Sequence, residues 1–308
     1  MIYSTHSWSQ IAEACFSEPD LRYALVSLVG KEGSSYLQPG ARLLVCEDGR
    51  YWGEISAGCL EEKVSLQAVD CIRRSQHQLL QIDTRPLYGC SGNISLLIEV
   101  IHDTQQFLSI LQEVQRARKH RKTLQVATEF TDLSTDHLTS VDSNPNSGQT
   151  RLVEQIVPPV QLLVLGDWPD GRATAALGKQ MGWQSVVYDA SAPMFSIQHT
   201  LLNHCVDKQT AVLIATHNLA RDAALLEQVL RSECGYIGVI GAHKRRLELA
   251  RLISDYNDYQ LIEAFEQIRC PAGLDLGGQG AHAIALSVVA GIQAQLCGRS
   301  AQPLCQRK

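Results

Sequence analysis

Hydrophobic residues in the first half of the chain form short runs separated by polar turns. These runs lie at residues 21–29, 41–46, 53–56, 79–83, 93–101 and 152–157. Short apolar runs with Gly, Ser, Pro or Asn at their ends are typical of β-strands. Apolar residues also recur every three or four positions after Leu60 and again after Phe107, which predicts two amphipathic helices. The first half is therefore predicted to be a mixed α/β domain.

Apolar strands and amphipathic helices alternate regularly in the second half. We predict strands at 161–165, 184–188, 211–216 and 235–240, and helices at 172–181, 219–230, 243–253 and 281–292. This order is typical of a Rossmann-like parallel sheet with helices on both faces. The last helix is predicted to bury the face that holds Ala281, Ile284, Ala285, Val288 and Ile292.

A polar segment, DSNPNSGQT at residues 142–150, is typical of a loop or linker. A short predicted strand and the pair Pro158–Pro159 follow it. We therefore predict two domains, residues 1–157 and 158–308. This division agrees with a prior of about 150 residues per domain.

Charge and composition exclude several classes of protein. The formal charge is −5, whereas nucleic-acid binders normally carry a basic excess. Hydrophobic residues make up 45% and charged residues 19%, which is typical of a folded chain. No apolar stretch reaches the roughly 20 residues that a membrane span needs, and the first residues lack the pattern of a secretory signal. We expect a cytoplasmic protein that binds neither nucleic acid nor membrane.

Two of the ten cysteines stand in turns made of small residues. Cys59 lies in SAGCLEE, where a turn enters a predicted helix, and Cys90 lies in GCSG. No C-x-x-C pair occurs, and all ten are expected to be thiols. Because a helix N-terminus favours a thiolate, Cys59 is predicted to be the more reactive of the two. We expect both sulfur atoms to face a common cavity; the alternative is that both are buried structural thiols.

The second domain begins with an altered version of a dinucleotide-binding loop. GDWPDG, at residues 166–171, stands where the pattern G-x-G-x-x-G would follow the first strand. Trp168 replaces the middle glycine, which lets a pyrophosphate approach the backbone, and Asp167 adds a negative charge there. Asp189 ends the second strand, as a ribose-binding acid would, or as an ordinary strand-end residue. We predict that ordinary NAD and FAD binding is absent.

Further candidate residues follow the later strands of this domain. His217 ends one strand, and Gly241 precedes the sequence HKRR, which includes His243 and Arg245. Open α/β sheets bind ligands at the carboxyl ends of their strands, so these residues are predicted to line the mouth of the sheet. There HKRR either holds a phosphate or forms an ordinary first helical turn. Asp275, in PAGLDLGG, is either structural or directed at a ligand.

Six motifs occur in order along the two halves: EGSSYLQPGARLLV, GEISAGCLE, GCSG, THN, YIGVIGAHKRR and PAGLDLGG. Together they resemble the XdhC/CoxI family, accessory factors for molybdenum hydroxylases such as xanthine dehydrogenase. The resemblance implies an N-terminal XdhC/CoxI domain and a C-terminal Rossmann-like domain. It also implies binding of the molybdenum cofactor, support of its sulfuration by a cysteine desulfurase, and delivery to the apo-enzyme. Cys59 and Cys90 match the family's two characteristic cysteines, whereas GDWP replaces the family's GAGH.

A carrier of this cofactor needs soft ligands for the metal and cations or N–H groups for the phosphate. Thiolates at Cys59 and Cys90 would suit the molybdenum, and Arg42 with the N–H groups of residues 33–40 would suit the phosphate. The candidate cofactor-binding residues are Cys59, Cys90, Gly33, Ser34, Ser35, Gly40, Arg42, Gly58 and Glu61. The cofactor implied is molybdopterin with molybdenum, either as such or as a cytidine dinucleotide.

We expect a maturation chaperone rather than a catalyst. The expected partners are the apo-subunit of a molybdenum hydroxylase, a cysteine desulfurase and a second copy of the chain in a homodimer. Two alternatives stay open. One is a protein-binding scaffold that has lost the cofactor, and the other is an NAD-dependent oxidoreductase that uses the Rossmann-like domain.

Overall fold

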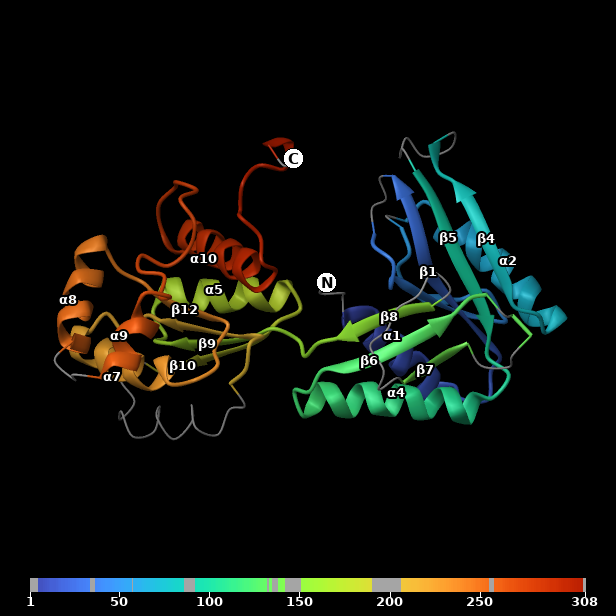
Figure 1. Cartoon of the computed structure of the whole chain (residues 1–308), viewed down its shortest axis with the longest axis horizontal. Coiled ribbons are helices and arrows are strands. Elements are labelled where there is room, and N and C mark those ends of the chain that lie inside the picture. Colours follow the sequence, from blue (N-terminus) through green and yellow to red (C-terminus); the bar gives the residue numbers. More distant parts are fainter. Residues whose placement is uncertain are drawn as a thin grey trace. The chain divides into compact units, whose positions relative to one another are not determined.

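A computed structural model describes residues 5–33, 37–56, 58–85, 92–131, 133–134, 138–141, 151–189, 206–254 and 258–306. The chain forms two compact units, Met1–Pro158 and Pro159–Lys308 (Figure 1). The sequence places this boundary between residues 157 and 158.

The first unit contains a five-stranded antiparallel sheet. Its strands, in spatial order, are β3 (Tyr51–Gly53), β2 (Arg42–Cys46), β1 (Tyr23–Gly33), β5 (Gly92–Val100) and β4 (Gln78–Asp83). Four of these strands match the predicted runs at 21–29, 41–46, 79–83 and 93–101. The strand predicted at 53–56 is wrong in its bounds, because β3 begins at Tyr51 and ends at Gly53, and a loop follows it.

Helices cover both faces of this sheet. The helix predicted after Leu60 is α2 (Glu61–Arg74), and its apolar residues pack on alternate residues of β1 and β5. The opposite face packs against α1 (Thr5–Ser17) and α4 (Thr104–Lys119), of which the sequence analysis predicts only the second. A three-stranded sheet also lies on that side, in the order β7 (Thr139–Val141), β6 (Leu124–Glu129) and β8 (Arg151–Ile156).

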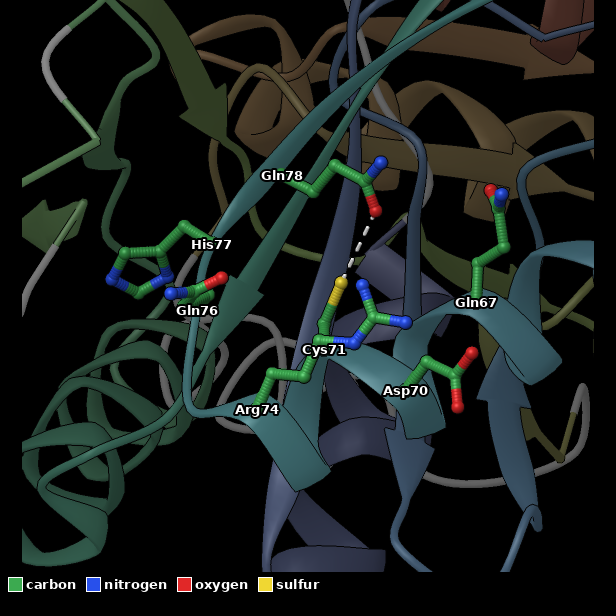
Figure 2. A pocket seen from close by; sticks show the side chains of 7 residues that line it. All are labelled: Gln67, Asp70, Cys71, Arg74, Gln76, His77 and Gln78. Carbon is green, nitrogen blue, oxygen red and sulfur yellow. Dashed lines mark hydrogen bonds between the residues drawn. The ribbon is translucent and has the colours of Figure 1, made fainter.

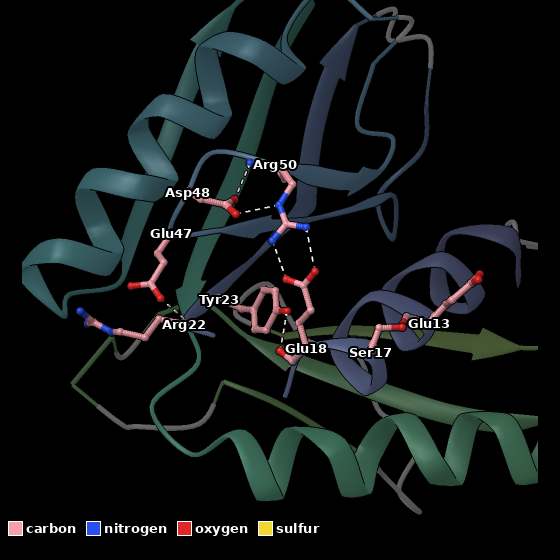
Figure 3. Close-up of polar contacts among 8 residues, drawn as sticks. All are labelled: Glu13, Ser17, Glu18, Arg22, Tyr23, Glu47, Asp48 and Arg50. Carbon is pink, nitrogen blue, oxygen red and sulfur yellow. Dashed lines mark hydrogen bonds and ion pairs between the residues drawn. The ribbon is translucent and has the colours of Figure 1, made fainter. Parts of the chain in front are cut away.

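An ion-paired cluster fixes α1 to the sheet at the end where β1 begins (Figure 3). Arg50, after the β2–β3 turn, donates to Glu18 Oε1 at 2.9 Å and to Asp48 Oδ2 at 2.7 Å. The Tyr23 hydroxyl donates to the Glu18 carbonyl oxygen at 2.8 Å. Hydrogen bonds from the Arg50 guanidinium lower the pKa of the Glu18 carboxyl group. The side chains of Arg50, Glu18 and Asp48 are exposed, so the main effect of their ion pairs is to orient the end of α1.

The second unit is a parallel sheet with helices on both faces, which confirms the predicted fold class. Its strand order is β10 (Gln184–Tyr188), β9 (Gln161–Leu165), β11 (Thr210–Ile214) and β12 (Tyr236–Val239). Helices α5 (Pro169–Gln180) and α10 (Ala281–Leu296) cover one face. Helices α7 (Leu219–Leu230), α8 (His243–Ser254) and α9 (Tyr259–Phe265) cover the other (Figure 1). A short 3₁₀ turn, η1 (Leu304–Gln306), lies near the end of the chain.

The buried face of α10 differs from the predicted face at two positions, one of which is Ala281, which is only half-buried. Ala285, Val288 and Ile292 are buried, as predicted, but Ile284 is 37% exposed. Val289 is buried instead. The buried stripe therefore runs through positions 285, 288, 289 and 292, which is the spacing of a single helix face.

Two glycines of the GDWPDG segment are required by close backbone packing. Gly166 has φ of +132°, and a Cβ there would lie 2.1 Å from the Ala215 carbonyl oxygen. A Cβ on Gly171 would lie 2.5 Å from the Gly166 carbonyl oxygen. These are the first and third glycines of the dinucleotide-loop pattern, so the tight strand-to-helix turn of that pattern is kept.

We expect Gly166→Ala to destabilise the protein by about 2–4 kcal/mol, because it adds a backbone clash to an unfavourable φ. Gly182→Ala is the matched control: its φ is +78°, but a Cβ there meets nothing within 4 Å. The control should cost about 1 kcal/mol in urea unfolding. Equal losses for the two variants would contradict the role of close packing at Gly166.

Candidate functional site

Three candidate segments leave the five-stranded sheet at the same end. Gly33, the last residue of β1, pairs with Gly92, the first residue of β5. The Gly40 N–H donates to the Leu28 carbonyl oxygen, and β3 runs toward this end from its pairing with β2. The segments 33–41, 54–60 and 84–92 therefore all join their strands at the same end of the sheet. Residues 34–36, 57 and 86–91, which include Ser34, Ser35 and Cys90, lie outside the described residues.

A shared apolar cluster holds two of these segments against the sheet. Leu37 and Ala41 from the first segment pack on the same cluster as Ile55 and Leu60 from the second. Ile94, near the start of β5, belongs to that cluster as well. The glycines predicted for the site have positive φ values: Gly33 +81°, Gly40 +103° and Gly58 +94°. The described parts of the first two segments thus have fixed places at this end of the sheet. The sulfur-to-sulfur distance between the two cysteines stays a prediction.

The thiol of Cys59 is exposed on the turn that enters α2. Its Sγ lies 3.6 Å from the Ser56 Oγ, and its backbone N–H donates to the same oxygen at 3.1 Å. The turn presents this sulfur to solvent while the backbone beneath it is hydrogen-bonded. An exposed sulfur on an ordered turn is suited to hold a soft metal or to accept and donate sulfur.

Glu61, predicted as a cofactor-binding residue, is instead part of the framework of the turn. Its side chain is buried, and Oε1 accepts the N–H groups of Ile55 at 3.1 Å and Ser56 at 2.7 Å. Oε2 accepts the Leu60 N–H at 3.1 Å and the Ser56 hydroxyl. Burial raises the pKa of this carboxyl group, but these hydrogen bonds outweigh burial and keep the pKa below its usual value. Both carboxylate oxygens are thus engaged within the turn and do not face an anionic cofactor.

The structure also changes the expected relation between Cys59 and the helix N-terminus. The carboxylate of Glu61, the first residue of α2, takes the N–H groups of the turn that leads into the helix. The sulfur of Cys59 has the Ser56 hydroxyl as its partner instead. The helix N-terminus is therefore not the feature that distinguishes this thiol. The feature that distinguishes it is its exposed position on the turn.

Most of the other described thiols are more buried than Cys59. Burial raises the pKa of Cys15 and of Cys234 to about 12, and it raises the pKa of Cys46, Cys71 and Cys270 as well. Cys305 is exposed, as Cys59 is, but it belongs to the second unit. Thiol exposure alone thus does not single out Cys59; its place in the turn does.

Cys71 lies in a polar cavity near the other end of α2 (Figure 2). The cavity measures about 310 Å³ and is lined by Gln67, Asp70, Cys71, Arg74, Gln76, His77 and Gln78. The Cys71 thiol points toward Gln78 and donates to its Oε1 at 3.4 Å. At 1.5 Å per helical residue, Cys71 is roughly 15 Å along the helix from Glu61, its first residue. Cys71 is not a second sulfur for the Cys59 site.

A second cavity of about 310 Å³ lies at the same end of the sheet as the Cys59 turn. It is lined by Lys31, Glu32, Gln81, Ile82, Asp83, Asn93, Ile94 and Ser95. These residues belong to the end of β1, the end of β4 and the start of β5. Its lining residues thus belong to the three strand ends that meet at this end of the sheet.

Arg42, predicted to hold the phosphate of a cofactor, is enclosed in the core of the first unit. The residue is 1% exposed. Its guanidinium donates to Glu154 Oε2 at 2.7 Å, to Ser27 Oγ at 2.5 Å and to Thr128 Oγ1 at 3.0 Å. The guanidinium also lies over the Trp8 ring, 4.8 Å from its centroid. These partners come from both sheets and from α1, so Arg42 joins elements and is not presented to a ligand.

In the second unit, the loops after β9 and β11 meet where the strand order reverses. Trp168 comes from the first loop and His217 from the second, and their rings pack edge to face with centroids 5.8 Å apart. The Asp170 carboxylate lies 3.3 Å from His217 Nε2 and accepts the Gly171 N–H at 2.8 Å. Pro169 contributes no N–H at the start of α5. A carboxylate thus occupies the helix end where a dinucleotide would place its phosphates.

The remaining predicted residues of this unit lie at the carboxyl ends of the strands. Arg245 pairs with the buried carboxylate of Asp222 at 2.5 Å, and Asp222 also accepts the Thr216 hydroxyl. Arg245 therefore joins α8 to α7. His243 is exposed at the start of α8, two residues after Gly241. Asp189 is exposed directly after β10, and Asp275 is exposed in the segment before α10. A shared ligand cleft among His217, His243 and these acids stays a prediction.

Two further features bear on the function. Within the described ranges, no group of three or more His, Cys, Asp or Glu side chains is arranged to hold a metal ion. None of the helices in the described part of the chain is long and apolar enough to cross a membrane.

Two family models match the chain. One, the XdhC and CoxI family, matches residues 18–83, and the other, the XdhC Rossmann domain, matches residues 162–292. The molybdenum cofactor insertion chaperone PaoD of Escherichia coli (strain K12) is 27% identical over 273 residues, or 86% of this chain and 81% of that protein. A protein of Bacillus subtilis (strain 168), named as a probable subunit of xanthine dehydrogenase, is 23% identical over 315 residues, or 87% and 91% of the two chains.

A crystal structure described as a xanthine dehydrogenase from Bacillus halodurans has the same fold. Its TM-score is 0.74 at 20% sequence identity, with 97% of this chain and 98% of that chain covered. The first family match contains the Cys59 turn, and the second contains the parallel sheet and the Trp168–His217 contact. Both halves thus agree with the resemblance drawn from the motifs, and the chain belongs to the XdhC and CoxI family.

Proposed function

We propose that this protein is an insertion chaperone that binds the molybdenum cofactor as cargo and delivers it to a molybdenum hydroxylase. The exposed Cys59 sulfur, on a turn whose backbone is hydrogen-bonded beneath it, carries the proposal. The name of the Escherichia coli relative supports the same cargo, and the name of the Bacillus subtilis relative supports a hydroxylase partner.

The Cys59 turn offers a ligand for the metal of this cargo, and the rest of the cofactor is left to the neighbouring segments. Cys59 supplies a soft sulfur ligand for molybdenum. Glu61 and Arg42 do not meet the cofactor, because both are buried and hydrogen-bonded within the unit. The proposed site is therefore Cys59 with Cys90, and with Gly33, Ser34, Ser35, Gly40 and Gly58 as backbone around them.

The proposal also covers the sulfuration of the cofactor, its nucleotide form and the proteins that this chain binds. An exposed thiol is positioned to support sulfuration of the cofactor, with a cysteine desulfurase as the sulfur donor. The cofactor is carried as molybdopterin or as its cytidine dinucleotide, and the apo-subunit of a hydroxylase receives it. A homodimer would match clients that are themselves dimeric.

The experiment that tests the proposal measures molybdenum and pterin bound to the purified protein after co-production with the cofactor pathway. We expect close to one molybdenum per chain, and reconstitution of an apo-hydroxylase by the loaded protein. Protein that carries neither metal nor pterin, but still binds a hydroxylase, would favour the scaffold alternative. The GDWP sequence in the second unit is the observation behind that alternative.

We also propose that the second unit does not bind NAD or FAD in the ordinary Rossmann manner. Trp168 stands in the place of the middle glycine, and the Asp170 carboxylate accepts a backbone N–H of the first turn of α5. A diphosphate there would meet a negative charge and an indole ring. We expect calorimetric titration with NAD, NADH and FAD near 1 mM to show no saturable heat. Saturable binding that Asp189→Ala removes would contradict this proposal and revive the oxidoreductase alternative.

A further inference from the structure

We propose that Ser56 and Glu61 are positioning residues that hold the backbone of the Cys59 turn so that the sulfur faces the cargo. The inference rests on the proposed function, because it assumes that the Cys59 sulfur is the contact with the cofactor. Neither positioning residue touches the cofactor itself. Both act by fixing the peptide groups on either side of Cys59.

Glu61 fixes the two ends of the turn to one carboxylate. The residue is 4% exposed. Its Oε1 holds the N–H groups of Ile55 and Ser56, before Cys59, at 3.1 and 2.7 Å. Its Oε2 holds the N–H of Leu60, after Cys59, at 3.1 Å. One buried side chain therefore sets the distance between the entry and the exit of the turn.

Ser56 fixes the middle of the turn. Its hydroxyl donates to the Glu61 carboxylate and accepts the N–H groups of Cys59 and Leu60, both at 3.1 Å. The Cys59 Sγ lies 3.6 Å from the same oxygen. Ser56 and Glu61 thus accept the N–H groups of Ile55, Ser56, Cys59 and Leu60, while Cys59 itself stays exposed.

A fixed backbone helps an exposed side chain such as Cys59 to bind a metal tightly. A loop residue loses conformational entropy when a ligand orders it, and that loss weakens binding. A side chain whose backbone is already fixed avoids most of this loss. Gly58, with φ of +94° and no atoms near a Cβ position, adds no packing of its own to the turn. Ile55 and Leu60 are held in the apolar cluster at either end of the turn, and the hydrogen bonds that Ser56 and Glu61 accept order the backbone between them.

The test compares four variants in the full-length protein. Glu61→Gln replaces one acceptor oxygen by an amide donor, and Ser56→Ala removes the hydroxyl. Ser56→Thr keeps the hydroxyl and is the rescue variant. Glu99→Gln is the matched control, because Glu99 is 3% exposed and accepts two N–H groups and one hydroxyl on β7 and the residue before it.

Two readouts separate positioning from stability. Amide hydrogen exchange of residues 55–60 reports the order of the turn, and molybdenum per chain after gel filtration reports cargo retention. We expect Glu61→Gln and Ser56→Ala to speed exchange of this segment at least tenfold and to lower bound molybdenum at least fivefold. Ser56→Thr should restore both values toward wild type. Glu99→Gln should change neither, even if its melting temperature falls as far.

Two outcomes would overturn the inference. In one, exchange at residues 55–60 rises but molybdenum retention stays at the wild-type level. In the other, exchange does not change, which would show that these hydrogen bonds do not order the turn. A different result would contradict the proposed function: the Cys59→Ser variant would keep its molybdenum. If Cys59→Ser loses molybdenum while Glu61→Gln and Ser56→Ala keep it, only the positioning inference is wrong.

Discussion

Cys59→Ser is expected to remove at least nine-tenths of the molybdenum that the purified protein retains, with the fold unchanged. The side chain is exposed, and its sulfur approaches the Ser56 hydroxyl at 3.6 Å. Loss of such a contact changes stability by no more than about 0.5 kcal/mol. Serine keeps the size of the side chain but offers a hard oxygen where a soft sulfur would bind molybdenum. Metal analysis of protein co-produced with the cofactor pathway measures the effect.

Cys305→Ser is the matched control for this experiment. Cys305 is also an exposed thiol, but it lies in the second unit, after α10. Its replacement should leave molybdenum content and activation of an apo-hydroxylase unchanged. Equal retention by wild type, Cys59→Ser and Cys305→Ser would show that the cargo is held elsewhere. Equal losses in both variants would point to a general effect of thiols, such as protection from oxidation.

The parallel unit followed from the sequence because its signals are local. Each of its strands is a short apolar run between a helix end and a turn, and β9 and β10 begin and end at the predicted residues. The antiparallel unit was harder, since β6 (LQVATE) is not a continuous apolar run and β7 has only three residues. Helix α1 did carry a signal: Trp8, Ile11, Ala12 and Cys15 have helical spacing and are buried.

The same difference applies to the site residues: some have partners close in the sequence, and others have partners far along the chain. Glu61 could have been recognised as a framework residue, because an acid in the first helical turn often reaches back to the residues before the helix. Arg42 could not. Its partners Thr128 and Glu154 lie 86 and 112 residues further along the chain. In the sequence alone it is a cation next to a Gly-rich loop, which is also what a phosphate site would show.

The buried position of Arg42 leads to a second large expected effect, on stability. Arg42 and Glu154 form an ion pair at 2.7 Å with side chains 1% and 2% exposed. Arg42→Met would leave the Glu154 carboxylate buried without its cation, although the Trp8 Nε1–H would still donate to it at 3.0 Å. An uncompensated buried charge of this kind costs about 3–5 kcal/mol. Guanidinium unfolding followed by circular dichroism measures the loss.

Two further variants test whether the loss of stability comes from the unpaired buried charge. Arg50→Met breaks an ion pair that is exposed to solvent and should change stability far less. The double variant Arg42→Met with Glu154→Met removes both buried charges, so it should recover a large part of the loss seen in the single variant. If Arg42→Met instead unfolds like wild type and loses molybdenum, Arg42 would act on the cofactor, as its place beside the 33–40 loop first indicated. A stability loss that the double variant recovers, with molybdenum retained, would establish that Arg42 joins the two sheets.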